Sequence, residues 1–122
     1  MTVTEDDAYR LLSRIGALRC YRGSSCAAVA ATLAANEPER LQLITKLLYP
    51  DVARHLGIRP HCVERNIRTV INYVWSNRTD AITDVLGTDL DAMPNASQFI
   101  SLLSSALRCG AGASQADVAC NQ

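Results

Sequence analysis

One run of the chain, residues 60–76 (PHCVERNIRTVINYVWS), combines long hydrogen-bond donors with a carboxylate and a thiol. A guanidinium can donate two parallel hydrogen bonds to guanine, and a carboxylate can accept one from the amino group of cytosine. Because successive residues of a helix are about 100° apart, the polar side chains fall on one face, with Glu64 and Cys62 at its flanks. That face carries His61, Arg65, Thr69, Asn72 and Ser76, with Arg68 nearby. The pattern favours recognition of DNA bases; an ordinary helical hairpin with a hydrated face is the alternative.

The elements that would position this face can also be read from the sequence. The opposite face of the helix is apolar and is expected to lie on a core; it carries Val63, Ile67, Val70, Ile71 and Val74. A short helix from Pro50 to about Leu56 precedes it, and Gly57 suits the sharp turn between the two. Pro60 suits the first position of the second helix. We therefore predict a helix-turn-helix at about residues 50–76.

The charge of the chain is unevenly distributed although its total is zero. Residues 46–78 carry six Lys or Arg and two Asp or Glu, whereas residues 79–122 carry one Arg and five Asp. This asymmetry predicts a local positive face for an anionic partner, with chance clustering as the alternative. Basic side chains near the helix-turn-helix that could hold phosphates without reading sequence are Lys46, Arg54, His55 and Arg59.

The composition predicts one all-helical domain. A chain of 122 residues, 48% of them hydrophobic, is long enough for one core. Its wealth of Ala and Leu and its few aromatic residues favour helices over sheets. We predict a single all-α bundle of six or seven helices over residues 1–108, followed by a flexible tail over residues 109–122.

Capping signals and prolines place the remaining helices. The expected N-caps are Thr4, Ser24 or Ser25, and Asn95 or Ser97. A helix over residues 39–48 (ERLQLITKLL) is expected to end at Tyr49, because a residue before proline avoids the α region. A short helix is expected at residues 80–87 (DAITDVLG), and the last helix at residues 97–108 (SQFISLLSSALR).

Other classes of function find little support. The five cysteines are odd in number and no pair has Cys-x-x-Cys spacing, which indicates reduced thiols in a cytoplasmic protein rather than a disulfide framework or a zinc site. The apolar run at residues 26–35 is too short to span a membrane. Paired carboxylates, glycine-rich phosphate loops and metal-ligand spacings are absent from the sequence. We therefore expect no enzymatic activity, metal or cofactor.

Residues 44–76 (ITKLLYPDVARHLGIRPHCVERNIRTVINYVWS) resemble the DNA-binding effector domain of the sporulation master response regulator. The resemblance extends through IGALRCYRG at residues 15–23 and, more loosely, NASQFISLLSSALR at residues 95–108. It covers roughly residues 5–108. It implies an all-helical domain with a central helix-turn-helix, which regulates transcription by binding double-stranded DNA as a homodimer on tandem sites.

The resemblance assigns roles to single residues. In that family the recognition helix reads bases through an Arg, a Glu and a second Arg. Glu64 and Arg65 match the last two, and Cys62 stands where the first Arg is expected. A thiol cannot replace the bidentate donation of a guanidinium, so we expect an altered or relaxed preference for DNA sequence. Oxidation of Cys62 would act at this same position. The matches to basic positions of the family are Arg54, His55 and Arg68.

Two further implications concern partners and control. Residues 76–87 (SNRTDAITDVLG) resemble the region that contacts the sigma subunit of RNA polymerase, which points to Asp80, Ala81 and Leu86. This segment is one residue shorter than in the family, with Ala81 in place of a serine and Leu86 in place of a phenylalanine, which argues against polymerase activation. Family members carry a receiver domain ahead of the effector domain, and this chain starts at about that boundary, so it is expected to be either an excised domain or a free-standing relative. Only in a free-standing relative would control by phosphorylation of its own receiver be excluded.

A protein-interaction module is the rival function. In this alternative, the chain is a degenerate relative that dimerises with a full-length regulator without reading DNA. The apolar residues of the last helix would supply the dimer face, although such a stripe is more often core; they are Phe99, Leu102, Leu103 and Leu107.

Overall fold

The computed structural model describes residues 3–17, 22–77 and 92–109, and every regular element in these ranges is a helix. The prediction of an all-α bundle is therefore confirmed. The elements are α1 (Glu5–Arg14), α2 (Arg22–Asn36), the 3₁₀ helix η1 (Pro38–Leu43), the π-helical turn η2 (Ile44–Leu48), α3 (Tyr49–Leu56), α4 (Pro60–Asn77) and α6 (Ala96–Arg108). The helix expected at residues 80–87 and the tail beyond Cys109 lie outside the described residues.

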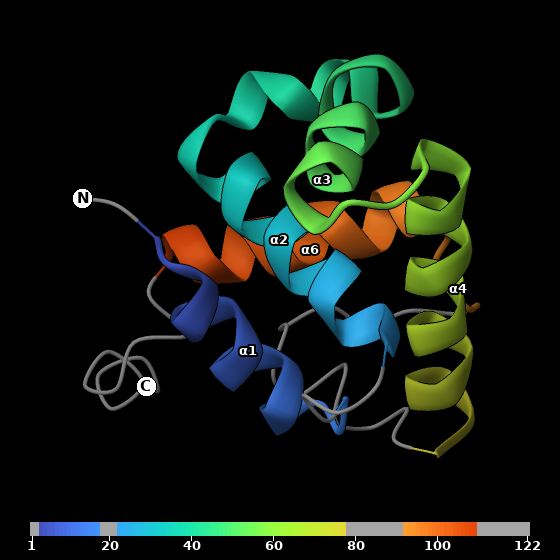
Figure 1. The fold of residues 1–122 in the computed structure, drawn as a ribbon. Coiled ribbons are helices and arrows are strands. Elements are labelled where there is room, and N and C mark those ends of the chain that lie inside the picture. Colours follow the sequence, from blue (N-terminus) through green and yellow to red (C-terminus); the bar gives the residue numbers. More distant parts are fainter. Residues whose placement is uncertain (1–2, 18–21, 78–91, 110–122) are drawn as a thin grey trace.

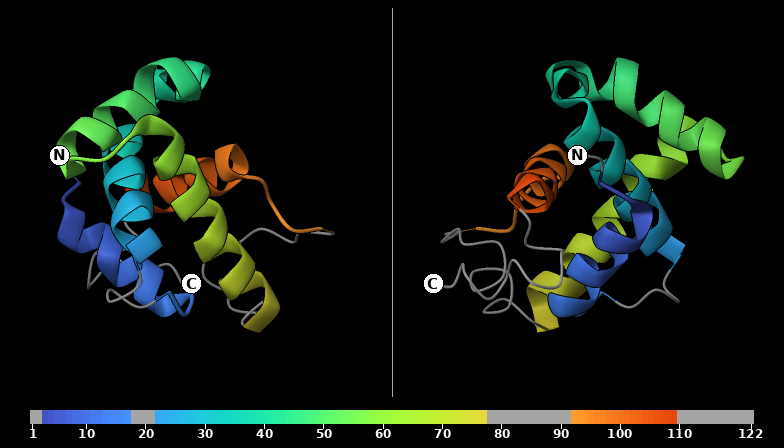
Figure 2. Two further views of the ribbon diagram at one scale, coloured as in Figure 1. Left: turned by 45° about the vertical axis from the view of Figure 1, so that its right-hand side comes forward. Right: turned by 90° about the vertical axis from the view of Figure 1, so that its left-hand side faces the viewer.

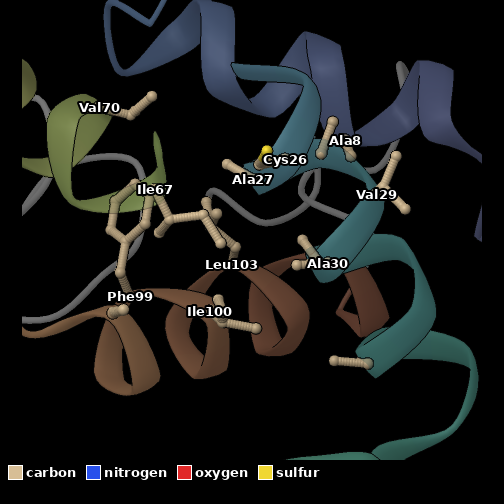
Figure 3. Close-up of a cluster of buried hydrophobic side chains, with 14 of the residues drawn as sticks. Ala8, Cys26, Ala27, Val29, Ala30, Ile67, Val70, Phe99, Ile100 and Leu103 are labelled. Atoms are coloured by element: carbon tan, nitrogen blue, oxygen red, sulfur yellow. The ribbon is translucent and has the colours of Figure 1, made fainter. Parts of the chain in front are cut away.

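Helix α2 is the centre of the bundle. It packs most extensively against α4 and α6, and also against α1 (Figures 1 and 2). Alanine predominates along it, and its small side chains are buried on nearly every side, which lets the neighbouring helices approach closely. In Figure 3, side chains from α2, α4 and α6 converge, with Ile67 of α4 beside Phe99 and Leu103 of α6. One core therefore fixes the helices around α2.

The ends of α1 and α6 follow from local side-chain chemistry. Thr4 caps α1 and Asn95 caps α6, as predicted, and each forms a reciprocal capping box with the residue three positions later, Asp7 and Gln98. In each box the first side chain accepts from a backbone N–H at the helix start, and the second side chain accepts from the cap's own N–H. These bonds satisfy donors that have no partner within a helix.

The predicted cap of α2 is wrong. Helix α2 begins at Arg22, so Ser24 and Ser25 lie inside it. Ser24 is fully buried, and the Ser25 hydroxyl accepts a hydrogen bond of 3.2 Å from Tyr9 of α1. The two serines therefore serve packing between helices rather than the start of one.

The single helix predicted for residues 39–48 is also wrong. The chain there forms η1 and η2, and it continues into α3 through Tyr49 in the α conformation (φ −59°, ψ −42°). Pro50 lacks a backbone N–H, and it is tolerated because it is the second residue of α3, where no intrahelical acceptor exists for that group. The local preference against an α conformation before proline is overridden at Tyr49, whose side chain is 4% exposed in the core.

Helices α3 and α4 are joined by three residues, 57–59, and pack against one another. Gly57 adopts the left-handed conformation (φ 72°, ψ 34°), as expected from its position in the turn. The Ala53 carbonyl accepts hydrogen bonds from the N–H groups of both Gly57 and Ile58. This closes α3 and turns the chain sharply into α4.

Candidate DNA-binding interface

Helix α4 has one buried face and one exposed face, as its sequence predicts. The buried residues are Val63, Ile67, Val70, Ile71 and Val74. The exposed residues are His61, Arg65, Arg68, Thr69, Asn72, Tyr73 and Ser76. Glu64 and Cys62 are half-buried at the two flanks. The exposed face of α4 therefore carries mainly side chains that can form hydrogen bonds. Among the described helices, α4 lies at one edge of the bundle (Figure 1).

The close approach of α2 holds α4 in place. A Cβ atom added to Gly23 would lie 2.2 Å from the Asn66 carbonyl oxygen and 2.5 Å from a methyl group of Val70. Only glycine fits at this crossing. The sequence analysis did not identify this role of Gly23, because no local signal distinguishes a glycine at a helix crossing from one in a loop.

The basic side chains near α4 fall into two groups. Lys46, Arg59, Arg65 and Arg68 make no ion pair with any described residue. No described carboxylate would therefore have to be displaced for an external anion to bind them. Arg54 and His55, on α3, are already paired.

Arg54 belongs to an ion-pair cluster centred on Asp51. The Asp51 carboxylate receives hydrogen bonds from Arg54 and from Arg40. Arg40 also donates to Glu37 at 2.9 Å and to the Leu47 carbonyl at 3.3 Å. Arg40 thereby ties η1 and η2 to α3. The sequence analysis did not identify it, because these contacts are made only once the chain folds back on itself.

His55 pairs with the first helix instead of standing free. Its Nε2 lies 3.0 Å from a carboxylate oxygen of Glu5. Val3, two residues before Glu5, is bound through its backbone to the Asn36 side chain by two hydrogen bonds of 2.8 and 2.9 Å. The start of the chain is thus held against both α2 and α3.

Glu64 lies on the flank of α4 that faces Tyr49. Burial, and to a smaller extent the Glu64 carboxylate, raise the pKa of the Tyr49 phenol to about 12, although the Arg68 guanidinium acts to lower it. Tyr49 therefore stays neutral near Glu64. The Glu64 carboxylate has no hydrogen-bond or ion-pair partner among the described residues, so no described donor occupies its acceptor positions.

The other flank of α4 borders an open groove of about 920 Å³. Its walls come from the first turns of α2, from Leu56 and Ile58 around the turn, and from α4 between Cys62 and Tyr73. The imidazole Nε2 of His61 lies 3.7 Å from the Cys62 sulfur. Across the groove, the Asn66 amide contacts the sulfur of Cys26 at 3.5 Å.

The chain matches the family model described as sporulation initiation factor Spo0A C terminal over residues 8–107. The match includes every helix except the first three residues of α1 and the last residue of α6. The chain belongs to this family. The family is one of DNA-binding effector domains of transcription regulators in sporulation.

Membership agrees with the resemblance seen in residues 44–76 and leaves several residue roles as predictions. The candidate polymerase contacts Asp80, Ala81 and Leu86 lie outside the described residues. The described part of the chain contains no group of three or more His, Cys, Asp or Glu side chains able to hold a metal ion. None of its helices has the length and apolar character needed to cross a membrane.

The apolar stripe of α6 lies in the core. Phe99, Leu103 and Leu107 are at most 5% exposed, and Leu102 is half-buried. Three of the four side chains expected in a dimer face are therefore already covered by the bundle.

Proposed function

We propose that this chain is a sequence-specific regulator of transcription in which α3 and α4 form a helix-turn-helix and α4 enters the major groove of DNA. The observation that carries the proposal is the exposure of Arg65 and its lack of an ion-pair partner among the described residues. It lies in the second turn of α4, is exposed, and is free of any described carboxylate. Such an arginine near the start of a recognition helix is suited to bidentate binding of guanine.

The neighbouring side chains extend the proposed base-reading surface. Glu64, with its unused acceptors, is placed to accept from cytosine, and His61 and Cys62 precede it in the first turn. The proposed phosphate contacts are Lys46, Arg54, His55, Arg59 and Arg68. Among these, Arg54 and His55 would first exchange their carboxylate partners for phosphate. We therefore expect them to contribute less than the other three residues, which have no ion-pair partner in the described part of the chain.

A salt titration of DNA binding tests the proposal. Five or six phosphate contacts predict that log affinity falls with log salt at a slope of about −4 to −6. Arg65→Ala should weaken binding to the preferred site by about 1–3 kcal/mol and reduce discrimination between sites. Arg108→Ala, which removes the same charge at the end of α6, is the matched control and should leave discrimination unchanged.

The same titration addresses the interaction-module alternative. A module that only pairs with other regulators predicts no preference for any DNA sequence at any salt concentration. Equal retention of specific and unrelated duplexes by the unmodified protein would overturn the proposed function. The described structure favours the DNA-binding function, because the exposed surface beside the core is the basic face of α4 rather than the apolar stripe of α6.

A further inference from the structure

Two thiols from different helices line the groove beside α4. Cys26 belongs to α2 and is 1% exposed, whereas Cys62 belongs to the first turn of α4 and is half-buried. Both border the same cavity, and both are free thiols. Figure 3 shows Cys26 on α2 with Val70 of α4 across from it. The groove thus brings together a partly accessible and a buried cysteine.

Asn66 relates the positions of the two thiols. Its amide nitrogen lies 3.5 Å from the Cys26 sulfur. Asn66 follows Cys62 by one helical turn, and side chains so spaced are neighbours on one face, with about 5–6 Å between their Cβ atoms. The crossing at Gly23 keeps α2 and α4 at backbone contact one turn away from Cys26. A movement of the first turn of α4 toward α2 would bring the sulfur atoms together.

The surroundings of Cys62 indicate the size and charge of the reagent that would react with it. The His61 imidazole is 3.7 Å from its sulfur and can take up the thiol proton. Among the residues described around the groove, Arg65 is the only charged side chain. A groove of this size, with one guanidinium that has no described carboxylate partner, favours a small disulfide that carries carboxylates over a cationic one.

We propose that Cys62 and Cys26 form a thiol–disulfide exchange site for small anionic disulfides. The Cys62 thiolate attacks one sulfur of the reagent, which forms a mixed disulfide and releases one thiol. Cys26 then loses its proton and attacks the Cys62 sulfur, which closes a bond between α2 and α4 and releases the second thiol. The protein gives up two electrons and two protons, and one molecule of disulfide becomes two molecules of thiol.

The order of attack follows from burial. Burial raises the pKa of the Cys26 thiol, the Asn66 hydrogen bond lowers it, and the neighbouring Cys62 raises it again. Cys26 is therefore the slower nucleophile and the resolving partner, whereas Cys62 borders the open groove. In this pair the more accessible thiol, Cys62, attacks the reagent, and the buried thiol, Cys26, resolves the mixed disulfide.

Closure of this bond would change the surface proposed to read DNA, and this consequence rests on the proposed function. A disulfide requires Cβ atoms about 3.5–4.5 Å apart, so the first turn of α4 must shift toward α2. The shift would break the hydrogen bond of 2.9 Å from the Cys62 N–H to the Arg59 carbonyl and would turn His61 and Arg65. Oxidation is therefore expected to weaken DNA binding reversibly.

The test uses the full chain with Cys20, Cys109 and Cys120 replaced by serine, so that only the two groove thiols remain. Glutathione disulfide is the anionic probe, and cystamine is its cationic counterpart. Incubation with glutathione disulfide should lower the intact mass by two hydrogens and join the peptides that contain Cys26 and Cys62. In the same background, Cys26→Ala should stop at a glutathione adduct on Cys62, and Cys62→Ser should not react. Glutathione disulfide should react faster than cystamine.

DNA affinity provides a separate readout. The oxidised protein should bind its preferred duplex about 5- to 150-fold more weakly than the reduced protein, with recovery after addition of dithiothreitol. Two free thiols after prolonged incubation, or a stable adduct with both cysteines present, would overturn the exchange site. Faster reaction with cystamine would overturn the reagent class. If the bond forms and the reduced protein shows no specific DNA binding, the proposed function fails while the exchange site stands.

Discussion

At the scale of single residues, Cys62 is the position where the resemblance of residues 44–76 leads us to expect an arginine. An arginine expected there would donate two hydrogen bonds to a base, whereas a thiol is a weak donor. The half-buried side chain of Cys62 faces the groove beside α4 rather than the centre of the exposed face. We therefore expect base recognition to depend on Glu64 and Arg65 and to be less stringent at the neighbouring base pair.

Cys62→Arg tests this expectation. The substitution should sharpen the preference at one base pair by about 1–3 kcal/mol, because it supplies the missing bidentate donor. Selection of binding sites from a random pool, carried out side by side for the two proteins, measures the change. Arg68→Lys keeps the charge of a phosphate-contact candidate and should leave the selected sequence as it is. Identical sites from the wild-type and Cys62→Arg proteins would contradict the expectation.

At the scale of helices, the crossing of α2 and α4 is the contact on which the orientation of the exposed face depends. Gly23→Ala should lower the free energy of unfolding by about 1–3 kcal/mol, because its Cβ would clash with the backbone of Asn66 rather than with a movable side-chain end. Gly57→Ala is a useful contrast, since a Cβ there has no neighbour within 4 Å and only the left-handed backbone is strained.

Urea unfolding separates these two causes. Gly57→Asn should recover part of the stability lost in Gly57→Ala, because asparagine tolerates the left-handed region better than alanine does. Gly23→Asn should be no better than Gly23→Ala, since the crossing has no room for any side chain. Equal stability of Gly23→Ala and the wild-type protein would show that the crossing can relax.

The helices themselves could be predicted where their causes are local. The caps at Thr4 and Asn95 and the left-handed Gly57 depend on residues within one or two turns, so their sequence signals were sufficient. The start of α2 and the path through Tyr49 and Pro50 were mispredicted, because burial in the core outweighed the local preferences there.

At the scale of the whole molecule, the candidate site also has parts that follow from local sequence and parts that depend on tertiary packing. Its exposed face follows from the period of a single helix, so the sequence alone placed Arg65 outside and Ile67 inside. The ion pairs of His55 with Glu5 and of Arg40 with Asp51, and the groove that Cys26 and Cys62 both line, bring separate segments of the chain together. Such contacts depend on tertiary packing, and no short-range pattern in one sequence reports them.

The response of the fold to alkali depends on residues where α3 and α4 meet. In the unfolded chain a tyrosine loses its proton near pH 10, whereas Tyr49 in the folded protein holds it to about pH 12. Above pH 10 the unfolded state therefore binds fewer protons than the folded state. The charged phenolate of Tyr49 is disfavoured in the folded protein, whereas in the unfolded chain water solvates it. The free energy of unfolding should accordingly fall between about pH 10 and pH 12, by at most about 2–3 kcal/mol from this residue.

Tyr49→Phe should remove most of this fall in the free energy of unfolding at high pH, because phenylalanine has no proton to lose. Urea midpoints measured at pH 8 and at several pH values above 10 would give, for each variant, the slope of the free energy of unfolding against pH. Tyr73→Phe, which changes a tyrosine that is 39% exposed, is the matched control. The buried Cys26 also has a raised pKa and should leave a smaller loss that begins at lower pH. We thus expect the free energy of unfolding to fall only slightly with pH in Tyr49→Phe, and to fall as steeply in Tyr73→Phe as in the wild-type protein. Equal slopes for both variants would mean that Tyr49 is not shielded from solvent, and that α3 and α4 do not enclose the phenol beside Glu64.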